Sequence, residues 1–287
     1  MRKIIFIGEC AVNIAFQAHT ASLSAQSGVM PNGTLLNAAI ASAGHDREVI
    51  YVSETARDFL GDMLVTHLSE SGIDTRCIDR YSEGGATTVY ITRHDTDSTC
   101  NEVIHSRMPQ QKFDTVWPRI DPADIVVFGD YFSLHERTRP QVTDLISHAA
   151  ERKALIIYVP GFPPQLAPRI TRIMPAILEN LEMAHIVFTT GRDLKQIFGN
   201  SDPETTYRNN IAFHTPVAFN FDPTTGTLSI SSANATDSMR LNKPADSASV
   251  LSSLIDSCCS LNLTPELIPI FPAALGGTVL KTIADKL

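Results

Sequence analysis

Short apolar runs alternate with longer helix-like segments along most of the chain, and this alternation restricts the fold more than any other feature. The strand-like runs are rich in β-branched or aromatic residues and lie at residues 3–8, 48–53, 125–128, 155–158, 186–188 and 217–219. The helix-like segments lie at residues 34–43, 59–71, 140–152, 247–260 and 273–286. Such alternation is typical of a parallel sheet covered by helices, so the sequence predicts an α/β fold.

Two stretches break the alternation, because they contain strand-like pieces with no helix between them. In the second stretch, residues 87–92 alternate polar and apolar side chains with a period of two, as a half-exposed sheet does. We therefore expect one domain over residues 1–287 that carries a small β-sheet lid, built from about residues 11–20 and 76–108. Residues 227–230 are expected to form a hairpin with the preceding strand.

The composition excludes several classes of function. The 287 residues include 31 acidic and 23 basic side chains, a net charge of −8, whereas nucleic-acid binding needs clustered Lys and Arg. No run of about 18 apolar residues is present that could cross a membrane. The five cysteines are odd in number and lack CxxC spacing, which argues against disulfides and zinc. We expect a cytoplasmic protein with reduced thiols.

Several motifs follow one another in a characteristic order. Gly8 and Glu9 end the first strand, Gly33 and Asn37 lie together in residues 31–39, and residues 51–61 end in an Asp-x-x-Gly turn. In this order the motifs resemble the ribokinase-like (PfkB) family of carbohydrate kinases, especially its fructokinase-like members. The resemblance extends over nearly the whole chain. It implies a three-layer α/β/α domain in which a sugar binds between the main sheet and the lid, and in which ATP with Mg²⁺ supplies the phosphoryl group.

The resemblance implies a partly retained sugar pocket. Asn13 occupies the position of a family aspartate that holds two sugar hydroxyls, and Gly33 and Asn37 match residues that line the same pocket. An amide can still form hydrogen bonds with a sugar, but it cannot accept two of them as an anion does. The alternative is local: Asn13 ends a strand, and Asn37 caps or packs within its own segment.

The phosphate-binding segment near the C-terminus departs from the family pattern. Asp246 matches the first family aspartate, but Ser249 and Leu251 replace glycines, and Ser252 replaces the aspartate that serves as catalytic base. Side chains at the glycine positions prevent the close approach of a phosphate to the backbone. Loss of a general base alone costs roughly 10²–10⁴ in rate. The local alternative for Asp246 is a helix N-cap, and Asp256, one turn after Ser252, is expected to be a solvated helix residue.

The other parts of the nucleotide site depart from the family as well. Asp193 replaces a family glutamate associated with Mg²⁺ and the phosphates, and it is the candidate metal ligand. Residues 222–226 supply one glycine where the family has two, and residues 159–163 lack the family's polar members. Together with Asp246 and Ser249, Asp193 completes the set of candidate nucleotide-binding residues.

These departures suggest one main hypothesis and two rivals. The first is a fructokinase-like homologue in which ATP-dependent phosphorylation of a sugar is impaired or lost. The others are a non-catalytic module that binds a sugar or metabolite, and a structural protein that dimerises through the lid. The distribution of glycine indicates that the nucleotide-binding segment has been lost, because Gly226 is the only glycine between Asn200 and Leu275. The family concentrates its phosphate-binding glycines in that region.

Overall fold

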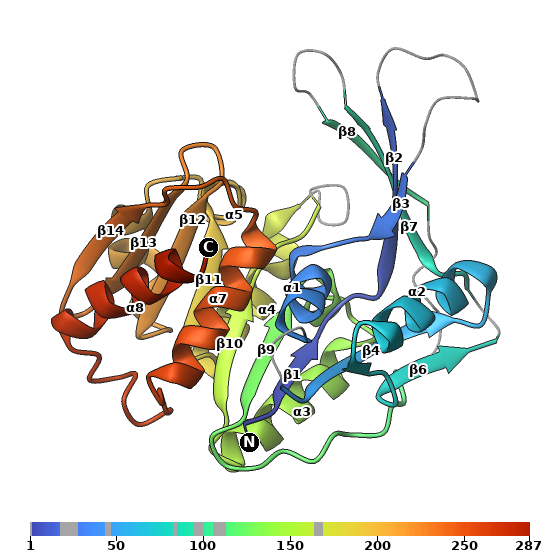
Figure 1. Cartoon of the computed structure of the whole chain (residues 1–287), viewed down its shortest axis with the longest axis horizontal. Helices are drawn as coiled ribbons and strands as arrows, with labels where there is room; N and C mark the ends of the chain where they lie inside the picture. The colour runs from blue at the N-terminus through green and yellow to red at the C-terminus, as the bar shows by residue number, and fades with distance from the viewer. Residues whose placement is uncertain are drawn as a thin grey trace.

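A twisted sheet of ten strands forms the centre of the protein (Figure 1). The computed structural model describes residues 2–17, 28–43, 47–82, 85–94, 100–105, 113–163 and 169–287. The strands run, from one edge, in the order β14 (Thr236–Arg240), β13 (Thr227–Ser232), β12 (Val217–Asp222), β11 (Ile186–Thr190), β10 (Leu155–Val159), β9 (Ile125–Gly129), β1 (Ile4–Ile7), β4 (Val49–Ala56) and β5 (Ile73–Asp74), and β6 (Ile78–Tyr81) also pairs with β4. Pairs from β12 to β6 are parallel, whereas β13 and β14 are antiparallel. The predicted α/β class and the predicted hairpin are confirmed.

Helices cover both faces of the sheet and enclose two apolar cores. Along β1, Ile4 and Phe6 belong to one core and Ile5 and Ile7 to the other, as the two-residue period of a strand requires. The first core is covered by α1 (Thr34–Ala43), α2 (Phe59–Glu70), α7 (Ser247–Ser260) and α8 (Ala273–Lys286). The second is covered by α3 (Arg139–Glu151), α4 (Ile170–Met183) and α5 (Gly191–Phe198). Shorter helical turns are η1 (Tyr131–Ser133), α6 (Pro203–Thr206) and the π-helix Tyr207–Ile211.

The helix bounds agree closely with the sequence pattern. Helices α1, α7 and α8 have the predicted bounds, and α2 and α3 differ by one residue. Local capping explains much of this agreement: the Asp58 side chain accepts a hydrogen bond from the Gly61 amide at 2.8 Å and so begins α2. Helix α4, which contains Pro175, is not indicated by the sequence pattern.

A second sheet of four strands forms the lid and stands away from the main sheet in Figure 1. Its order is β3 (Gly28–Pro31), β2 (Ala11–Gln17), β7 (Thr88–His94) and β8 (Cys100–His105), and β2 and β7 are parallel. The expected lid boundaries need two corrections. Strand β6 joins the main sheet because its backbone pairs with the end of β4, and β3 belongs to the lid although residues 28–31 were not expected there. The expected lid residues 18–20, 83–84, 95–99 and 106–108 lie outside the described residues.

Helix α7 packs against α1 and α8, and its buried residues include both apolar and polar side chains. Asp256 lies in this helix, and the expectation that it is solvated is wrong, because only 3% of it is exposed. Its carboxylate pairs with Arg47 at 2.5 Å and with Lys286 at 3.3 Å. The ion pairs join α7 to α8 and to the residue that precedes β4 by two positions. Within the described part of the chain, no helix is long and apolar enough to cross a membrane.

Candidate functional site

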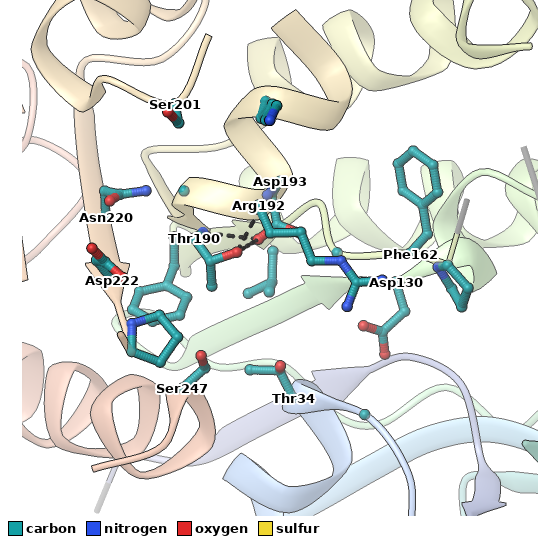
Figure 2. A pocket seen from close by; sticks show the side chains of 18 of the residues that line it. Thr34, Asp130, Phe162, Thr190, Arg192, Asp193, Ser201, Asn220, Asp222 and Ser247 are labelled. Carbon is teal, nitrogen blue, oxygen red and sulfur yellow. Dashed lines mark hydrogen bonds between the residues drawn. The ribbon is translucent and has the colours of Figure 1, made fainter. Parts of the chain in front are cut away.

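A cavity of about 940 Å³ opens where the central parallel strands end, and lid strand β7 contributes Tyr90 to its wall. Figure 2 shows many of the side chains that line it. Ligands of open α/β sheets bind at this edge, because the loops after parallel strands converge there. The lid-side half of the cavity is formed by Glu9, Gly33, Tyr90 and Asp130. The hairpin-side half, next to β12 and β13, is formed by Thr190, Asp193, Asn220, Asp222 and Ser247.

Asp130 follows β9 in the lid-side half with an unusual backbone conformation, φ +53° and ψ −173°. Its amide donates a hydrogen bond to the Val159 carbonyl at 3.1 Å, so the end of β9 is held close to β10. Gly129 permits this approach, because a Cβ added there would lie 1.9 Å from the Val159 oxygen. The backbone therefore holds Asp130 at the cavity in one orientation.

The carboxylate of Asp130 fits between two glycines. A Cβ added at Gly8 would lie 3.2 Å from its Oδ2, and one added at Gly33 would lie 3.8 Å away. Removal from water raises the pKa of Asp130 well above its usual value, and the charges of Glu9 and Asp193 act in the same direction. A carboxylic group with a raised pKa in a cavity is a candidate for ligand contact or proton transfer.

Glu9 connects the lid to the main sheet. The Tyr90 hydroxyl, from lid strand β7, donates a hydrogen bond to its Oε2 at 2.5 Å. The Tyr51 hydroxyl, from β4, donates one to its backbone carbonyl at 2.8 Å. Glu9 is 8% exposed, so these contacts hold a carboxylate near the junction of lid and sheet.

The structure brings one of the three predicted sugar-binding residues to the cavity. Gly33 lines it, with φ at +97°, immediately before α1. The Asn37 amide instead donates hydrogen bonds to the carbonyls of Gly33 at 2.8 Å and Pro31 at 3.3 Å. Asn13 accepts a hydrogen bond from the Thr92 hydroxyl at 3.1 Å, between β2 and β7. Neither asparagine is among the described residues that line the cavity.

In the hairpin-side half, Asp193 is bound to the start of its own helix, α5. Its Oδ2 accepts hydrogen bonds from the Thr190 amide at 2.8 Å and from the Thr190 hydroxyl at 2.7 Å. The Thr190 side chain in turn accepts one from the Asp193 amide, which completes a capping box. Burial raises the pKa of Asp193, although the bonds from Thr190 oppose this change. The predicted metal ligand therefore has one oxygen occupied by its own helix.

Two other acidic residues of this region are also used locally. Asp222 accepts hydrogen bonds from the Thr224 amide and the Thr225 hydroxyl, both at 2.9 Å, and so shapes the β12–β13 turn. Asp246 accepts a hydrogen bond from the Ser249 amide at 2.7 Å and is the N-cap of α7. The N-cap alternative for Asp246 is confirmed, and Ser249 contributes its amide to that cap.

Ser252, at the position of the family's catalytic base, lies outside the cavity. Helix α7 begins at Ser247, so Ser252 is in its second turn and faces α1. Its hydroxyl is 3.0 Å from that of Ser42, and only 3% of the residue is exposed. Ser247, five residues earlier, lines the cavity instead.

The described residues contain no group of three or more His, Cys, Asp or Glu side chains that could hold a metal ion. Sequence reasoning also missed Asp130, Tyr90 and Arg192, which line the cavity. Figure 2 shows Arg192 extending from the start of α5 across the cavity. Asp130 had a signal in the sequence, because it follows a buried strand and a glycine, where parallel sheets place ligand contacts.

Comparison with known proteins agrees with the architecture. The sequence model of the pfkB family of carbohydrate kinases matches residues 1–214. No curated protein sequence matches the chain. The structure of fructokinase from Xylella fastidiosa has a TM-score of 0.79 at 15% identity, over 100% of this chain and 92% of that one.

Two further structures have the same fold. Fructokinase from Halothermothrix orenii has a TM-score of 0.73 at 17% identity, over 99% of this chain and 97% of that one. Aminoimidazole riboside kinase from Salmonella enterica, determined with aminoimidazole riboside and an ATP analogue, has a TM-score of 0.76 at 12% identity, over 99% and 90% of the two chains. At these identities the likeness concerns the fold.

Proposed function

Because the chain belongs to the pfkB family of carbohydrate kinases, we propose that it binds a sugar in the cavity between the main sheet and the lid. We further propose that it is a fructokinase-like homologue in which ATP-dependent phosphorylation of a sugar hydroxyl is impaired or lost. The fructokinase neighbours support the choice of a sugar as ligand. The retained lid-side half, with Glu9, Gly33 and Asp130 around the cavity, supports sugar binding.

The environment of Ser252 carries the proposal of impaired transfer. A general base must lie within hydrogen-bond reach of the hydroxyl that it deprotonates. The Ser252 hydroxyl lies against Ser42 between two helices, and serine is not a base in the absence of an activating neighbour. A ligand in the cavity would not reach it.

ATP is the nucleotide that this relationship suggests, since fructokinase from Xylella fastidiosa has been determined with bound ATP. The residues of the hairpin-side half fit Mg²⁺-ATP poorly. Asp193 and Asp222 use carboxylate oxygens in their own turns, and Ser249 and Leu251 add side chains where glycines would admit a phosphate. We therefore expect weak nucleotide binding, with Asp193 as the candidate metal ligand.

A non-catalytic sugar-binding module is the second candidate, and the contrast between the two halves of the cavity favours it. A dimer formed through the lid and a cytoplasmic location stay predictions. For the dimer, β3 is an edge strand of the lid, and its Val29 and Met30 are 50% and 47% exposed.

Isothermal titration calorimetry of the purified chain with D-fructose, related sugars and Mg²⁺-ATP tests the proposal, together with an assay of ADP release. We expect saturable sugar binding and no sugar-dependent ADP release above background. The Ser252→Ala variant should bind sugar like the wild type, because that hydroxyl does not face the cavity. Absence of binding to every sugar would refute the sugar pocket. Rapid, sugar-dependent ADP release would refute the impairment.

A further inference from the structure

The Asp-x-x-Gly turn at residues 58–61 lies outside the cavity, and its side chains contact the base of the lid. Figure 1 shows α2, which begins at this turn, beside that base. The carboxylate of Asp58 accepts two hydrogen bonds from Thr87, the residue before lid strand β7, at 2.8 Å from the amide and 2.6 Å from the hydroxyl. Neither residue is among the described residues that line the cavity. The motif therefore joins a helix of the main domain to the lid.

The main sheet holds Thr87 from a second side. Its hydroxyl lies 3.1 Å from that of Thr55 in β4, and only 1% of each threonine is exposed. Since the Thr87 hydroxyl donates its hydrogen to Asp58, it accepts the one from Thr55. The start of β7 is thus attached to both α2 and β4.

Gly61 allows the first turn of α2 to approach the base of the lid. A Cβ added at this position would lie 2.2 Å from the Ala56 carbonyl oxygen and 2.7 Å from the Thr87 hydroxyl oxygen. Only glycine leaves room for both contacts. The aspartate of the motif therefore supplies the hydrogen-bond acceptors, and the glycine permits the close packing. We call Thr55, Asp58, Gly61 and Thr87 the lid anchor.

The acceptor at the centre of the lid anchor is an ionised carboxylate. Burial would raise the pKa of Asp58, but the hydrogen bonds from Thr87 and Gly61 and the charge of Arg80 outweigh this effect and lower it. Hydrogen bonds to an ionised acceptor are about twice as strong as those between neutral groups. The attachment of β7 is therefore stronger than a contact between two neutral side chains would be.

Strand β7 depends on this attachment more than its neighbour β2 does. Strand β2 follows β1 after residues 8–10, so the main sheet fixes its direction, whereas β7 follows β6 only after residues 82–87. Tyr90 lies three positions after Thr87 in the chain, and its hydroxyl donates a hydrogen bond to Glu9 at 2.5 Å in the wall of the cavity. A shift of Thr87 would therefore move Tyr90 away from Glu9.

We propose that Asp58 is a positioning residue, which fixes the start of β7 so that Tyr90 is held against Glu9 in the wall of the cavity before a ligand binds. Asp58 acts from outside the cavity, through Thr87 and the strand that carries Tyr90. Because Tyr90 is part of the cavity wall, movement of the lid opens the cavity, and a bound sugar should then leave faster. This last consequence rests on the proposed function.

Hydrogen–deuterium exchange of the whole protein, read by mass spectrometry, measures the opening of the lid without any ligand. Thr87→Val removes the two hydroxyl contacts and keeps both the shape of the side chain and the cap on α2. Asp58→Asn removes the charge, and Thr87→Ser, the conservative variant, keeps the hydroxyl. Thr215→Val is the matched control, because Thr215 is also buried and its hydroxyl donates to the Leu181 carbonyl at 2.7 Å, away from the cavity and the lid.

We expect amide exchange in β2 and β7 to accelerate about 10-fold in Thr87→Val, because a hydrogen bond to a charged acceptor is lost. The acceleration should be larger in Asp58→Asn, since its side-chain N–H would face a backbone amide in either orientation. Exchange in β1 and β9 should not change, and Thr87→Ser should behave like the wild type. Thr215→Val should leave exchange in the lid unchanged, even if it lowers the Tm as much as Thr87→Val does.

The release of a sugar tests the link to the cavity. The dissociation rate of isotope-labelled D-fructose, measured from NMR line shapes, should increase in Thr87→Val by about the same factor as exchange in the lid. In Thr87→Ser and Thr215→Val it should stay at the wild-type value. The local change in exchange, together with rescue by serine, distinguishes positioning of the lid from a general loss of structure.

Unchanged exchange in the lid of both Thr87→Val and Asp58→Asn would overturn this proposal and leave the proposed function standing. Equal acceleration in the lid and in β1 and β9, or the same acceleration in Thr215→Val, would show a general loss of structure and would also overturn it. So would faster exchange in the lid with an unchanged rate of fructose release. A wild-type protein that binds none of the sugars would refute the proposed function alone, and the exchange results would then decide this proposal by themselves.

Discussion

The two halves of the cavity use their polar side chains in different ways. In the lid-side half, the carboxylate of Asp130 faces the cavity, and Glu9 is held there by Tyr90. In the hairpin-side half, the acidic side chains of Asp193 and Asp222 complete a helix cap and a turn. A carboxylate oxygen that satisfies its own backbone is less available to a ligand. The number of polar residues around a cavity is therefore a poor measure of what the cavity can bind.

Helix α7, whose first residue Ser247 lines the hairpin-side half, also uses its polar side chains locally. Helix α7 begins with the cap from Asp246, so Ser252 is directed to α1 and Ser42. The helix is thus stabilised by interactions with its own end and with its neighbour. We infer that the polar groups of the hairpin-side half stabilise the local structure, whereas the lid-side half retains a strained backbone conformation at Asp130.

Restoring a carboxylate at position 252 is the strongest way to test this contrast. Ser252→Asp should lower the free energy of unfolding by about 3–5 kcal/mol, because it buries a charge between α1 and α7 without a cation. Ser252→Ala should cost about 1 kcal/mol, since only the contact with Ser42 is lost. Urea denaturation measures both values. If Ser252→Asp were stable and gave sugar-dependent ADP release, Ser252 would face the cavity in solution, and the contrast would be broken.

Two glycine substitutions test how closely other atoms pack against the backbone in each half of the cavity. Gly129→Ala, beside Asp130, should cost about 3 kcal/mol, because the new methyl group would overlap the Val159 carbonyl. Gly191→Ala, at the start of α5, should change stability by less than about 0.5 kcal/mol, because the nearest atom would lie 3.9 Å away. Thermal or urea unfolding of both variants measures the difference. Equal effects would mean that the backbone of the lid-side half is not specially constrained.

The dependence of stability on pH should have opposite signs in the two halves. Between the usual pKa of an aspartate and the raised pKa of Asp130, the folded protein binds more protons than the unfolded chain, so its stability falls as pH rises. Asp130→Asn removes this loss, and its stability relative to the wild type should increase from pH 4 to pH 8, by ~1.4 kcal/mol for each unit of pKa shift.

In the hairpin-side half, Asp222 is the residue whose effect on stability we compare with that of Asp130. Hydrogen bonds from Thr225 and Thr224 lower the pKa of Asp222, so their contribution is present above the usual pKa of aspartate and is lost as pH falls through the lowered value. Asp222→Asn should therefore destabilise the protein at neutral pH and have less effect near pH 3. The effect should be a few tenths of a kcal/mol, because the residue is close to solvent. Urea midpoints of the wild type, Asp130→Asn and Asp222→Asn, measured from pH 3 to pH 8, test both predictions. We expect the stability of the two variants relative to the wild type to change with pH in opposite directions. A change in the same direction would contradict the comparison.

Much of the architecture could be predicted because it follows from local pattern. Apolar runs such as residues 125–128 and 155–158 are buried strands in the structure, and the limits of α7 follow from its apolar spacing and from Asp246. The lid was predicted less well. Strand β6 pairs with β4 although its sequence fits either sheet, because strand pairing depends on residues that are distant in the chain.

The candidate site was predicted only in part, for the same reason. The motifs located Gly33 in the cavity, but Asn13 and Asn37 contact Thr92 and the backbone of residues 31–33. Asp130 was missed although it follows a recognisable strand. Its role depends on Gly8, Gly33 and Val159, and only folding brings these residues together.

The amino-acid sequence by itself determined the α/β alternation, the family and the caps, since these rest on residues within a few positions of one another. Only the tertiary structure decided which polar groups face the cavity. Each residue along a helix turns the side chain by about 100°, so the start of α7 determines that Ser247 faces the cavity and Ser252 does not. The position of Asp130 likewise depends on a backbone conformation that β9 and β10 impose on each other.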